Sequence, residues 1–102
     1  MNVLGFSQGG PTATRWVINN KFKMNSLILW GCDLPNDCLL EDNKSRWSDF
    51  RLKYVIGKND EYIDDEKIIH EKEKLTNYGL VYDFHLFEGG HNIESSTLKK
   101  LI

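Results

Sequence analysis

Apolar residues gather in four short runs along the chain, and turn-forming or polar residues bound each run. The run at 26–31, SLILWG, is continuous, which is typical of a strand that is buried on both faces of a sheet. Between the runs, apolar residues recur at helical spacing. We therefore expect strands at residues 2–6, 26–31, 51–57 and 80–87, and helices at about 8–22, 61–78 and 92–102.

The order of these elements predicts the fold class. Strands that alternate with helices are the signature of βαβ units, in which parallel strands pair and helices cover the sheet. Residues 33–50 interrupt the alternation as an irregular polar insertion, with a short helix expected at 39–47. The sequence therefore predicts one α/β domain over residues 1–102, with a parallel sheet of about four strands flanked by helices.

The apolar positions of two expected helices indicate which faces cover the sheet. In the 8–22 helix these positions are Ala13, Trp16, Val17 and, at its end, Phe22. The 61–78 helix has acidic first turns and a glycine directly after it, which suit the two ends of a helix. Its apolar residues are sparse, so we expect one narrow stripe against the sheet. This stripe consists of Ile68, Ile69, Leu75 and Tyr78.

Composition and charge argue against several function classes. The 102 residues include 13 basic and 15 acidic side chains, for a net charge of −2. No run of Lys or Arg is interleaved with aromatic residues, which argues against a nucleic-acid or anionic-membrane partner. The longest apolar run, at 27–30, is far too short to cross a bilayer, and the first residues lack the pattern of a signal peptide. We expect a cytoplasmic protein.

The sequence also predicts a protein without metal or cofactor. Cys32 and Cys38 are the only cysteines, and their spacing matches no common zinc site. Nothing indicates an oxidising compartment, so we expect both thiols to be reduced. The glycines at positions 5, 9 and 10 do not form a phosphate loop, because no Gly-Lys-Ser/Thr follows them.

The turn after the first strand holds a candidate nucleophile. The stretch from Gly5 to Gly9 reads GFSQG and fits the pattern G-x-S-x-G, in which a strained strand-to-helix turn exposes a serine. Little space remains two residues to either side of that serine, so Gly5 and Gly9 suit the turn. The backbone N–H of Gln8 would point at the oxyanion, helped by the helix N-terminus. The pattern predicts that Ser7 is a nucleophile.

Two further strand ends carry the residue types that would activate such a serine. Asp60 follows the third strand and His91 follows the fourth, which gives the order expected for an α/β-hydrolase triad. The C-terminal ends of parallel strands lie at one edge of a sheet, so the three side chains can converge there. His91 would take the proton from Ser7, and Asp60 would orient the imidazole.

Each of these residues also has a simpler interpretation. Ser7 could be only a helix N-cap, Asp60 could cap the following acidic helix, and His91 could be a plain loop histidine. Asp33, just after the second strand, is the alternative acid, since a carboxylate there could also reach the histidine. The agreement of residue type, order and strand-end position favours the catalytic interpretation.

The remaining histidines and two tryptophans are expected in structural roles. His70 falls on the charged helix as a solvated side chain, and His85 lies in the last strand as a partly exposed residue. Trp16 would pack on the helix behind the nucleophile, and Trp30 would lie at a strand end near the site.

The motifs GFSQGG, GKNDEYI and FEGGHNI resemble the nucleophile, acid and histidine motifs of α/β-hydrolase-fold serine esterases. The nearest group is the carboxylesterase and lysophospholipase-like family that includes acyl-protein thioesterases. The resemblance covers essentially the whole chain. It implies the C-terminal half of such a fold, beginning at the nucleophile strand, and hydrolysis of carboxylic esters or thioesters through an acyl-enzyme.

The same resemblance implies what the chain does not contain. Family members carry about as much sequence again before the nucleophile strand, including several strands and a second oxyanion N–H. The first strand of this chain would therefore expose an unpaired apolar edge. One hypothesis is half of a serine esterase, either truncated or one partner of a split enzyme. The other is an inactive remnant or interaction module that pairs its open edge with another chain.

The expected partners follow from these two hypotheses. They are a small-molecule ester or thioester, and either a second copy of the chain or the missing N-terminal half. The insertion is expected to form a rim over the site, with apolar residues that would contact an acyl chain or simply pack. These residues are Leu39, Leu40, Trp47 and Phe50.

Overall fold

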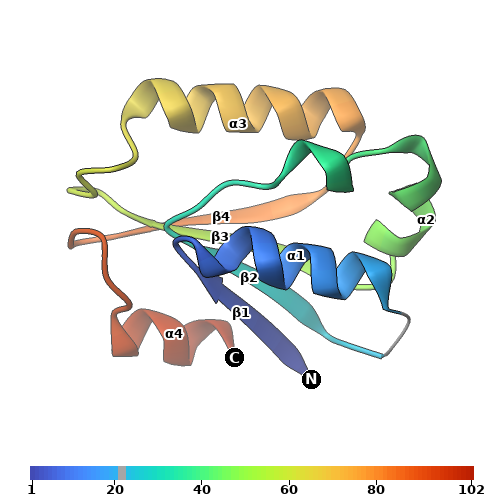
Figure 1. Ribbon diagram of the computed structural model, residues 1–102. Coiled ribbons are helices and arrows are strands. Elements are labelled where there is room, and N and C mark those ends of the chain that lie inside the picture. Colours follow the sequence, from blue (N-terminus) through green and yellow to red (C-terminus); the bar gives the residue numbers. More distant parts are fainter. Residues whose placement is uncertain (21–22) are drawn as a thin grey trace.

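The computed structural model describes residues 1–20 and 23–102. Within them, strands and helices alternate along the chain, and two short 3-10 turns fall in the insertion (Figure 1). The strands are β1 (Asn2–Phe6), β2 (Ser26–Trp30), β3 (Arg51–Gly57) and β4 (Tyr82–Phe87). The helices are α1 (Gly9–Asn19), α2 (Lys44–Trp47), α3 (Asp65–Tyr78) and α4 (Ser95–Leu101).

The four strands form one parallel sheet in the order β1-β2-β3-β4, so each strand pairs with its neighbour in the sequence. The predicted α/β class with about four parallel strands is confirmed. Among the described residues, β1 has a strand on one side only, which is the open edge that the family resemblance implied. Because all strands are parallel, their C-terminal ends lie at one edge of the sheet.

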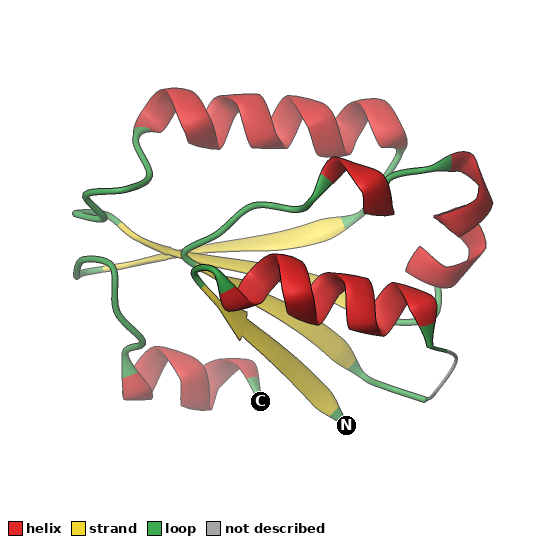
Figure 2. Cartoon of the chain, in the orientation of Figure 1, coloured by secondary structure: helices red, strands yellow, loops and turns green. Residues whose placement is uncertain are grey.

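Helices cover both faces of the sheet. Helices α1 and α3 lie on one face of the sheet, and α4 lies on the other (Figure 2). The first face holds the larger core, where Val17 of α1 and Leu75 of α3 pack with Leu27, Leu29 and the ring of Tyr54. The opposite face holds a smaller core under α4. Its buried residues are Ile28, Trp30, Val55, Phe87 and Leu101.

The strand predictions are more accurate than the helix predictions. The first and third strands have the predicted bounds, and the other two are one and two residues shorter. Each helix is shorter than predicted. The helices α3 and α4 begin later, because polar residues near their expected starts belong to turns. The first helix ends at Asn19, since Asn20 has an extended backbone (φ −127°, ψ 132°). The predicted helical residue Phe22 lies outside the described residues.

Two apolar residues that we expected to face the sheet do not. Trp16 is 51% exposed and Ile69 is 57% exposed. The apolar face of α3 is instead formed by Leu75 with the partly buried Ile68 and Tyr78. At helical spacing, neighbouring residues 68 and 69 differ by about 100° in direction, so one faces the sheet and the other faces away.

The insertion after β2 is a series of tight turns rather than a helix over 39–47. The turns span Asn36–Cys38 and Glu41–Asn43, and the short α2 follows them. Trp47 and Phe50 are buried in the larger core, where Trp47 Nε1 donates to the carbonyl of Cys38 at 3.0 Å. Both cysteines are free thiols, as expected. None of the helices in residues 1–20 and 23–102 has the length and hydropathy needed to span a membrane.

Candidate active site

Ser7 lies in the tight turn between β1 and α1. Its φ of +53° is the only positive value among the described non-glycine residues, and such a backbone is unfavourable for a residue with a side chain. The turn is held by its backbone: Ser7 N–H donates to the carbonyl of Trp30 and Gly10 N–H donates to that of Ser7, each at 3.0 Å. Gln8, not Ser7, is the N-cap residue of α1.

Of the three glycines around Ser7, the structure leaves no space for a side chain at positions 5 and 10, and it leaves space at position 9. A Cβ on Gly5 would lie 2.7 Å from the Cα of Gly10, so the turn does require a glycine there. A Cβ on Gly9 would meet nothing within 4 Å, which corrects the expectation that the second glycine of the motif is required for space. A Cβ on Gly10 would instead lie 2.2 Å from the thiol of Cys32.

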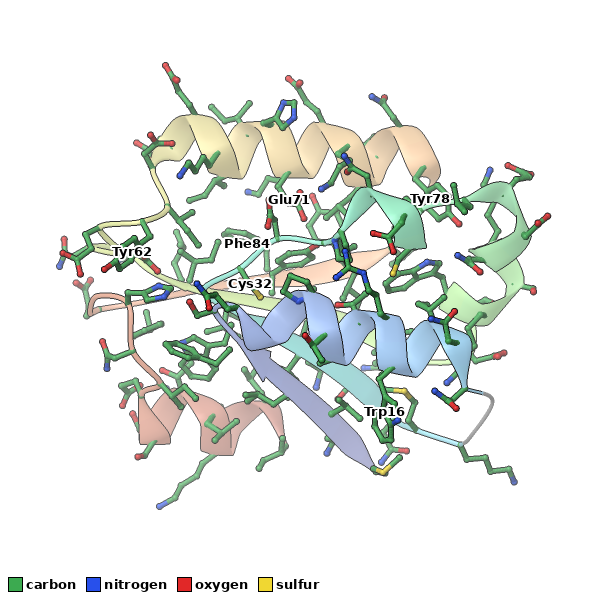
Figure 3. The ribbon with its side chains drawn as sticks, in the orientation of Figure 1. Trp16, Cys32, Tyr62, Glu71, Tyr78 and Phe84 are labelled. Atoms are coloured by element: carbon green, nitrogen blue, oxygen red, sulfur yellow. The ribbon has the colours of Figure 1, made fainter. Side chains whose placement is uncertain are left out.

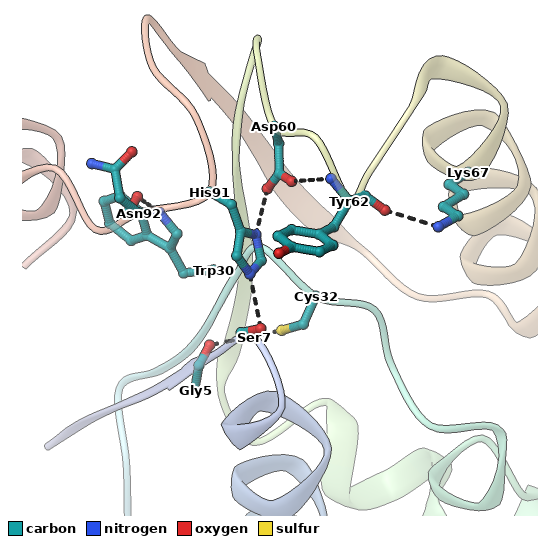
Figure 4. A network of polar contacts seen from close by, with 9 residues as sticks. All are labelled: Gly5, Ser7, Trp30, Cys32, Asp60, Tyr62, Lys67, His91 and Asn92. Carbon is teal, nitrogen blue, oxygen red and sulfur yellow. Dashed lines mark hydrogen bonds and ion pairs between the residues drawn. The ribbon is translucent and has the colours of Figure 1, made fainter.

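The structure brings Ser7, His91 and Asp60 together from three strand ends (Figure 4). The Oγ of Ser7 lies 2.8 Å from His91 Nε2, and His91 Nδ1 lies 2.8 Å from Asp60 Oδ2. The imidazole is therefore hydrogen-bonded through both ring nitrogens. This chain of contacts joins residues that are up to 84 positions apart in the sequence.

Asp60 is buried and its carboxylate is held in one orientation. The side chain is 1% exposed, and its second oxygen, Oδ1, accepts from the backbone N–H of Tyr62 at 2.8 Å. The N-cap of α3 is Asp64, whose Oδ1 accepts from Lys67 N–H at 2.9 Å. The alternative interpretation of Asp60 as a helix cap therefore does not apply.

Two aromatic rings and a glycine flank the His91 imidazole. The centroid of the Phe6 ring lies 5.0 Å from that of the imidazole. The centroid of the Tyr62 ring lies 4.7 Å from it, and the Tyr62 ring is edge-on to the imidazole. Gly31 has a φ of +65°, and a Cβ there would lie 3.0 Å from His91 Cε1. Neither Tyr62 nor Gly31 was predicted at the site from the sequence. A glycine directly after the buried second strand was the available signal for Gly31.

The loop that carries His91 is anchored to the sheet by Trp30. Trp30 Nε1 donates to the carbonyl of Asn92 at 2.9 Å, and the indole packs against Phe87. The expected position of Trp30 at a strand end near the site is confirmed. His70 is exposed and His85 is half-buried, as expected for a solvated and a sheet residue.

A cavity of about 640 Å³ opens beside Ser7 and His91. The alternative acid Asp33 lines this cavity, but His91 Nδ1 is bonded to Asp60. Gln8, at the start of α1, lines the cavity too. The remaining lining residues include Pro11, Gly31, Cys32, Ile56, Tyr62, Ile63, Lys67, Ile68, Glu71 and Phe84.

The residues predicted to form a rim are absent from this lining. Trp47 and Phe50 are core residues, and Leu39 packs partly against the same core. Leu40 is 55% exposed, and its carbonyl accepts a hydrogen bond from the hydroxyl of Tyr78. The expectation that the insertion places these four residues over the site is therefore corrected: three of the side chains turn inward to the core and Leu40 is exposed.

Cys32 and Glu71 are two further polar lining residues that were not predicted at the site from the sequence. Burial raises the pKa of the Cys32 thiol to about 12, so the thiol is neutral at pH 7. Its Sγ lies 3.7 Å from the carbonyl of Gly5, beside the Ser7 turn. Glu71 is 9% exposed and comes from the inner face of α3. No group of three or more His, Cys, Asp or Glu within the described residues is arranged as a metal site.

Comparisons with solved structures place this arrangement in a known fold. A ferulic acid esterase matches with a TM-score of 0.71 at 18% sequence identity, over 98% of this chain and 48% of that chain. An α/β hydrolase enzyme, MGS-M1, from a Medee basin deep-sea metagenome library matches with a TM-score of 0.55 at 19% identity, over 89% of this chain and 39% of that chain. A puromycin-hydrolyzing peptidase from Mycobacterium tuberculosis matches with a TM-score of 0.54 at 15% identity, over 90% and 19% of the two chains.

These matches support an α/β-hydrolase-like fold and show how much of that fold the chain covers. The chain spans about half the length of the ferulic acid esterase. A comparison with curated protein sequences found no match. The model of the phospholipase/carboxylesterase family matches residues 1–102. The chain therefore belongs to the phospholipase/carboxylesterase family.

Proposed function

We propose that this chain carries the catalytic residues of a serine hydrolase that cleaves carboxylic esters or thioesters. The observation that supports this most strongly is the uninterrupted hydrogen-bonded series from Ser7 Oγ through the His91 imidazole to Asp60 Oδ2, with both contacts at 2.8 Å. A serine that is hydrogen-bonded to a base, which is itself held by a buried carboxylate, is the arrangement that activates a hydroxyl as a nucleophile. Membership of a phospholipase/carboxylesterase family agrees with this chemistry.

The proposed reaction has two steps. Ser7 Oγ attacks the carbonyl carbon while His91 Nε2 takes the hydroxyl proton, and the imidazolium then gives this proton to the leaving alcohol or thiol. An acyl-Ser7 ester remains. In the second step a water molecule attacks that ester, His91 takes the proton from the water, and the free acid leaves as Ser7 is protonated again. Asp60 stays ionised throughout and stabilises the imidazolium.

The oxyanion of each step needs hydrogen-bond donors. We assign the backbone N–H of Gln8, which follows the nucleophile at the start of α1, as one donor. In an α/β hydrolase the second donor comes from a loop that precedes the nucleophile strand. Loss of one such donor typically lowers turnover by about 10²–10³. A chain limited to these 102 residues is therefore expected to react slowly.

The test is covalent labelling of the purified chain with a fluorophosphonate probe, which reacts with activated serines. We expect labelling of the unchanged chain, and none after Ser7→Ala or His91→Ala. Ser96→Ala, at an exposed serine of α4, is the matched control and should label normally. Labelling that persists in His91→Ala would contradict the proposed activation of Ser7.

The same experiment separates the proposal from an interaction module without catalysis. Such a module would fold and yet fail to label, so circular dichroism of each variant accompanies the labelling. A folded, unlabelled chain would favour the hypothesis that the exposed edge of β1 pairs with another chain.

A further inference from the structure

The cavity beside Ser7 combines apolar walls with one buried charged group. The apolar lining consists of Pro11, Ile56, Ile63, Ile68 and Phe84. Tyr62 adds an aromatic ring at the His91 end of the cavity. Two aromatic side chains and several branched aliphatic ones suit a flat apolar group such as a substituted benzene ring.

Glu71 is the buried charged group in this lining. It projects from α3 toward Phe84 and Cys32, into the space between that helix and the sheet (Figure 3). Its side chain is 11% exposed. A carboxylate in such a place needs hydrogen-bond donors on its oxygens, because burial removes the water that would otherwise solvate it.

The chain supplies three donors to this carboxylate. Oε2 accepts from the backbone N–H of Leu34 at 2.8 Å and from the hydroxyl of Tyr54 at 2.7 Å. Oε1 lies 2.7 Å from the ammonium of Lys74. A carboxylate has about four acceptor positions, so one position remains on Oε1. Lys74 already balances the negative charge, so a neutral donor is sufficient to fill this position.

We propose that the cavity binds the phenol-bearing part of an ester, with the phenolic hydroxyl donating to Glu71. This inference rests on the proposed function, because it names the class of ester that would be presented to Ser7. The apolar walls hold the ring, and the buried carboxylate selects a ring that carries a hydroxyl. A ring with a hydroxyl adds a fourth hydrogen bond to this charged acceptor, and a ring without one cannot make that bond.

The direct test compares two ligands on one protein, so that no variant needs to fold differently. Ser7→Ala is used to prevent turnover, and calorimetry measures its affinity for methyl 3-(4-hydroxyphenyl)propanoate and for methyl 3-phenylpropanoate. A hydrogen bond to a charged acceptor should make the hydroxylated ester bind roughly ten-fold more tightly. Equal affinity for the two esters would overturn the proposal.

A second arm locates the contact. Glu71→Gln should reduce the preference to less than about three-fold, because it removes the charged acceptor. Glu73→Gln, two residues along the same helix and exposed, should keep the full preference. In methyl NMR spectra the hydroxylated ester should shift the resonance of Ile68, which lines the cavity, and leave that of the outward-facing Ile69 unchanged. A preference that survives Glu71→Gln, or a shift at Ile69 without one at Ile68, would refute the contact.

These measurements are independent of catalysis. If the fluorophosphonate probe fails to label Ser7 while the ligand preference is present, the proposed function is wrong and the binding site stands. If Ser7 labels and the two esters bind equally, the proposed function stands and the phenol-binding site is wrong.

Discussion

At the scale of single residues, the site depends on contacts that neighbouring positions do not share. Gly9 and Gly10 are adjacent and chemically identical, yet only Gly10 lies against the Cys32 side chain. Asp33 and Asp60 each follow a strand of the sheet, yet Asp60 is the one bonded to His91. The sequence presents these pairs as near equivalents, and the three-dimensional surroundings distinguish them.

The two glycines give a prediction about stability. Gly10→Ala would force a Cβ to within 2.2 Å of Cys32 Sγ, so we expect the free energy of unfolding to fall by about 1–3 kcal/mol. Gly9→Ala adds a methyl group to open space at the first residue of α1 and should be neutral or stabilising by up to about 1 kcal/mol. Urea denaturation of both variants measures the difference. Equal changes in the free energy of unfolding would show that the close approach of residue 10 to Cys32 does not destabilise Gly10→Ala.

The two aspartates give a prediction about turnover. Asp60→Asn should lower kcat for a p-nitrophenyl ester by on the order of 10⁴, because the imidazole loses its correct tautomer and its charged partner. Asp33→Asn should change kcat far less, since His91 Nδ1 is bonded to Asp60. A larger loss from Asp33→Asn than from Asp60→Asn would reverse the assignment of the acid.

Burial of Cys32 gives a prediction about pH. Its pKa is raised from 9.0 to about 12 in the folded chain, mainly by desolvation, so the folded state favours the neutral thiol. The unfolded chain ionises first, and stability should therefore be unaffected below pH 9 and should fall as the pH rises from 9 toward 12. Desolvation also raises the pKa of Tyr54, which acts in the same direction.

Urea midpoints at pH 8 and pH 10.5 measure this dependence. The decrease in midpoint between the two values should be smaller in Cys32→Ala, which has no thiol to ionise. An identical decrease in that variant would exclude Cys32 as a contributor.

At the level of elements, the strands follow the local apolar pattern, and side-chain caps fix the starts of α3 and α4. The apolar runs of β1 and β3 coincide with the observed strands. For β3, an inner strand, the reason is that both faces must be apolar to be buried. Several acidic residues precede α3, and each could begin a helix. Asp64 does so because its side chain caps Lys67 N–H, while residues 60–63 form the turn that carries Asp60 to His91.

The cap of α3 gives a prediction at this scale. Asp64→Ala removes the acceptor for Lys67 N–H and should lower the free energy of unfolding by about 1 kcal/mol. Asp65→Ala, at the next position, removes a favourable charge near the helix start and should cost only about 0.3 kcal/mol. Thermal denaturation of the two variants distinguishes capping from charge, and a larger effect at position 65 would contradict this assignment.

At the scale of the whole molecule, the sheet has two edges. Among the described residues β1 and β4 each pair with one neighbour, and β1 bears the Ser7 turn. An open edge offers backbone donors and acceptors to another strand. The chain also spans about half of the ferulic acid esterase that it matches. The edge of β1 beside the Ser7 turn is therefore a candidate surface for pairing with another strand.

A chain of these 102 residues is therefore predicted to self-associate through an edge of its sheet. In sedimentation velocity, the average mass of the sedimenting species should increase as the protein concentration rises from about 5 to about 200 µM. Asn2→Lys adds a charge to β1 at an exposed position and should reduce association. Asn77→Lys makes the same change of charge on exposed α3 and should leave it unaltered. Association that is insensitive to Asn2→Lys would argue against the β1 edge.

A reader of the sequence alone can predict the α/β class, the strand positions and the three polar residues at strand ends, because hydrophobic periodicity and motif order are local properties of the chain. The folded chain is needed to see which glycine meets Cys32, which aspartate meets His91, and that Trp47 and Phe50 enter the core. It also placed the buried carboxylate of Glu71 in the wall of the cavity. These are contacts between residues distant in the sequence, and they depend on how helices pack over the sheet, which no local pattern encodes.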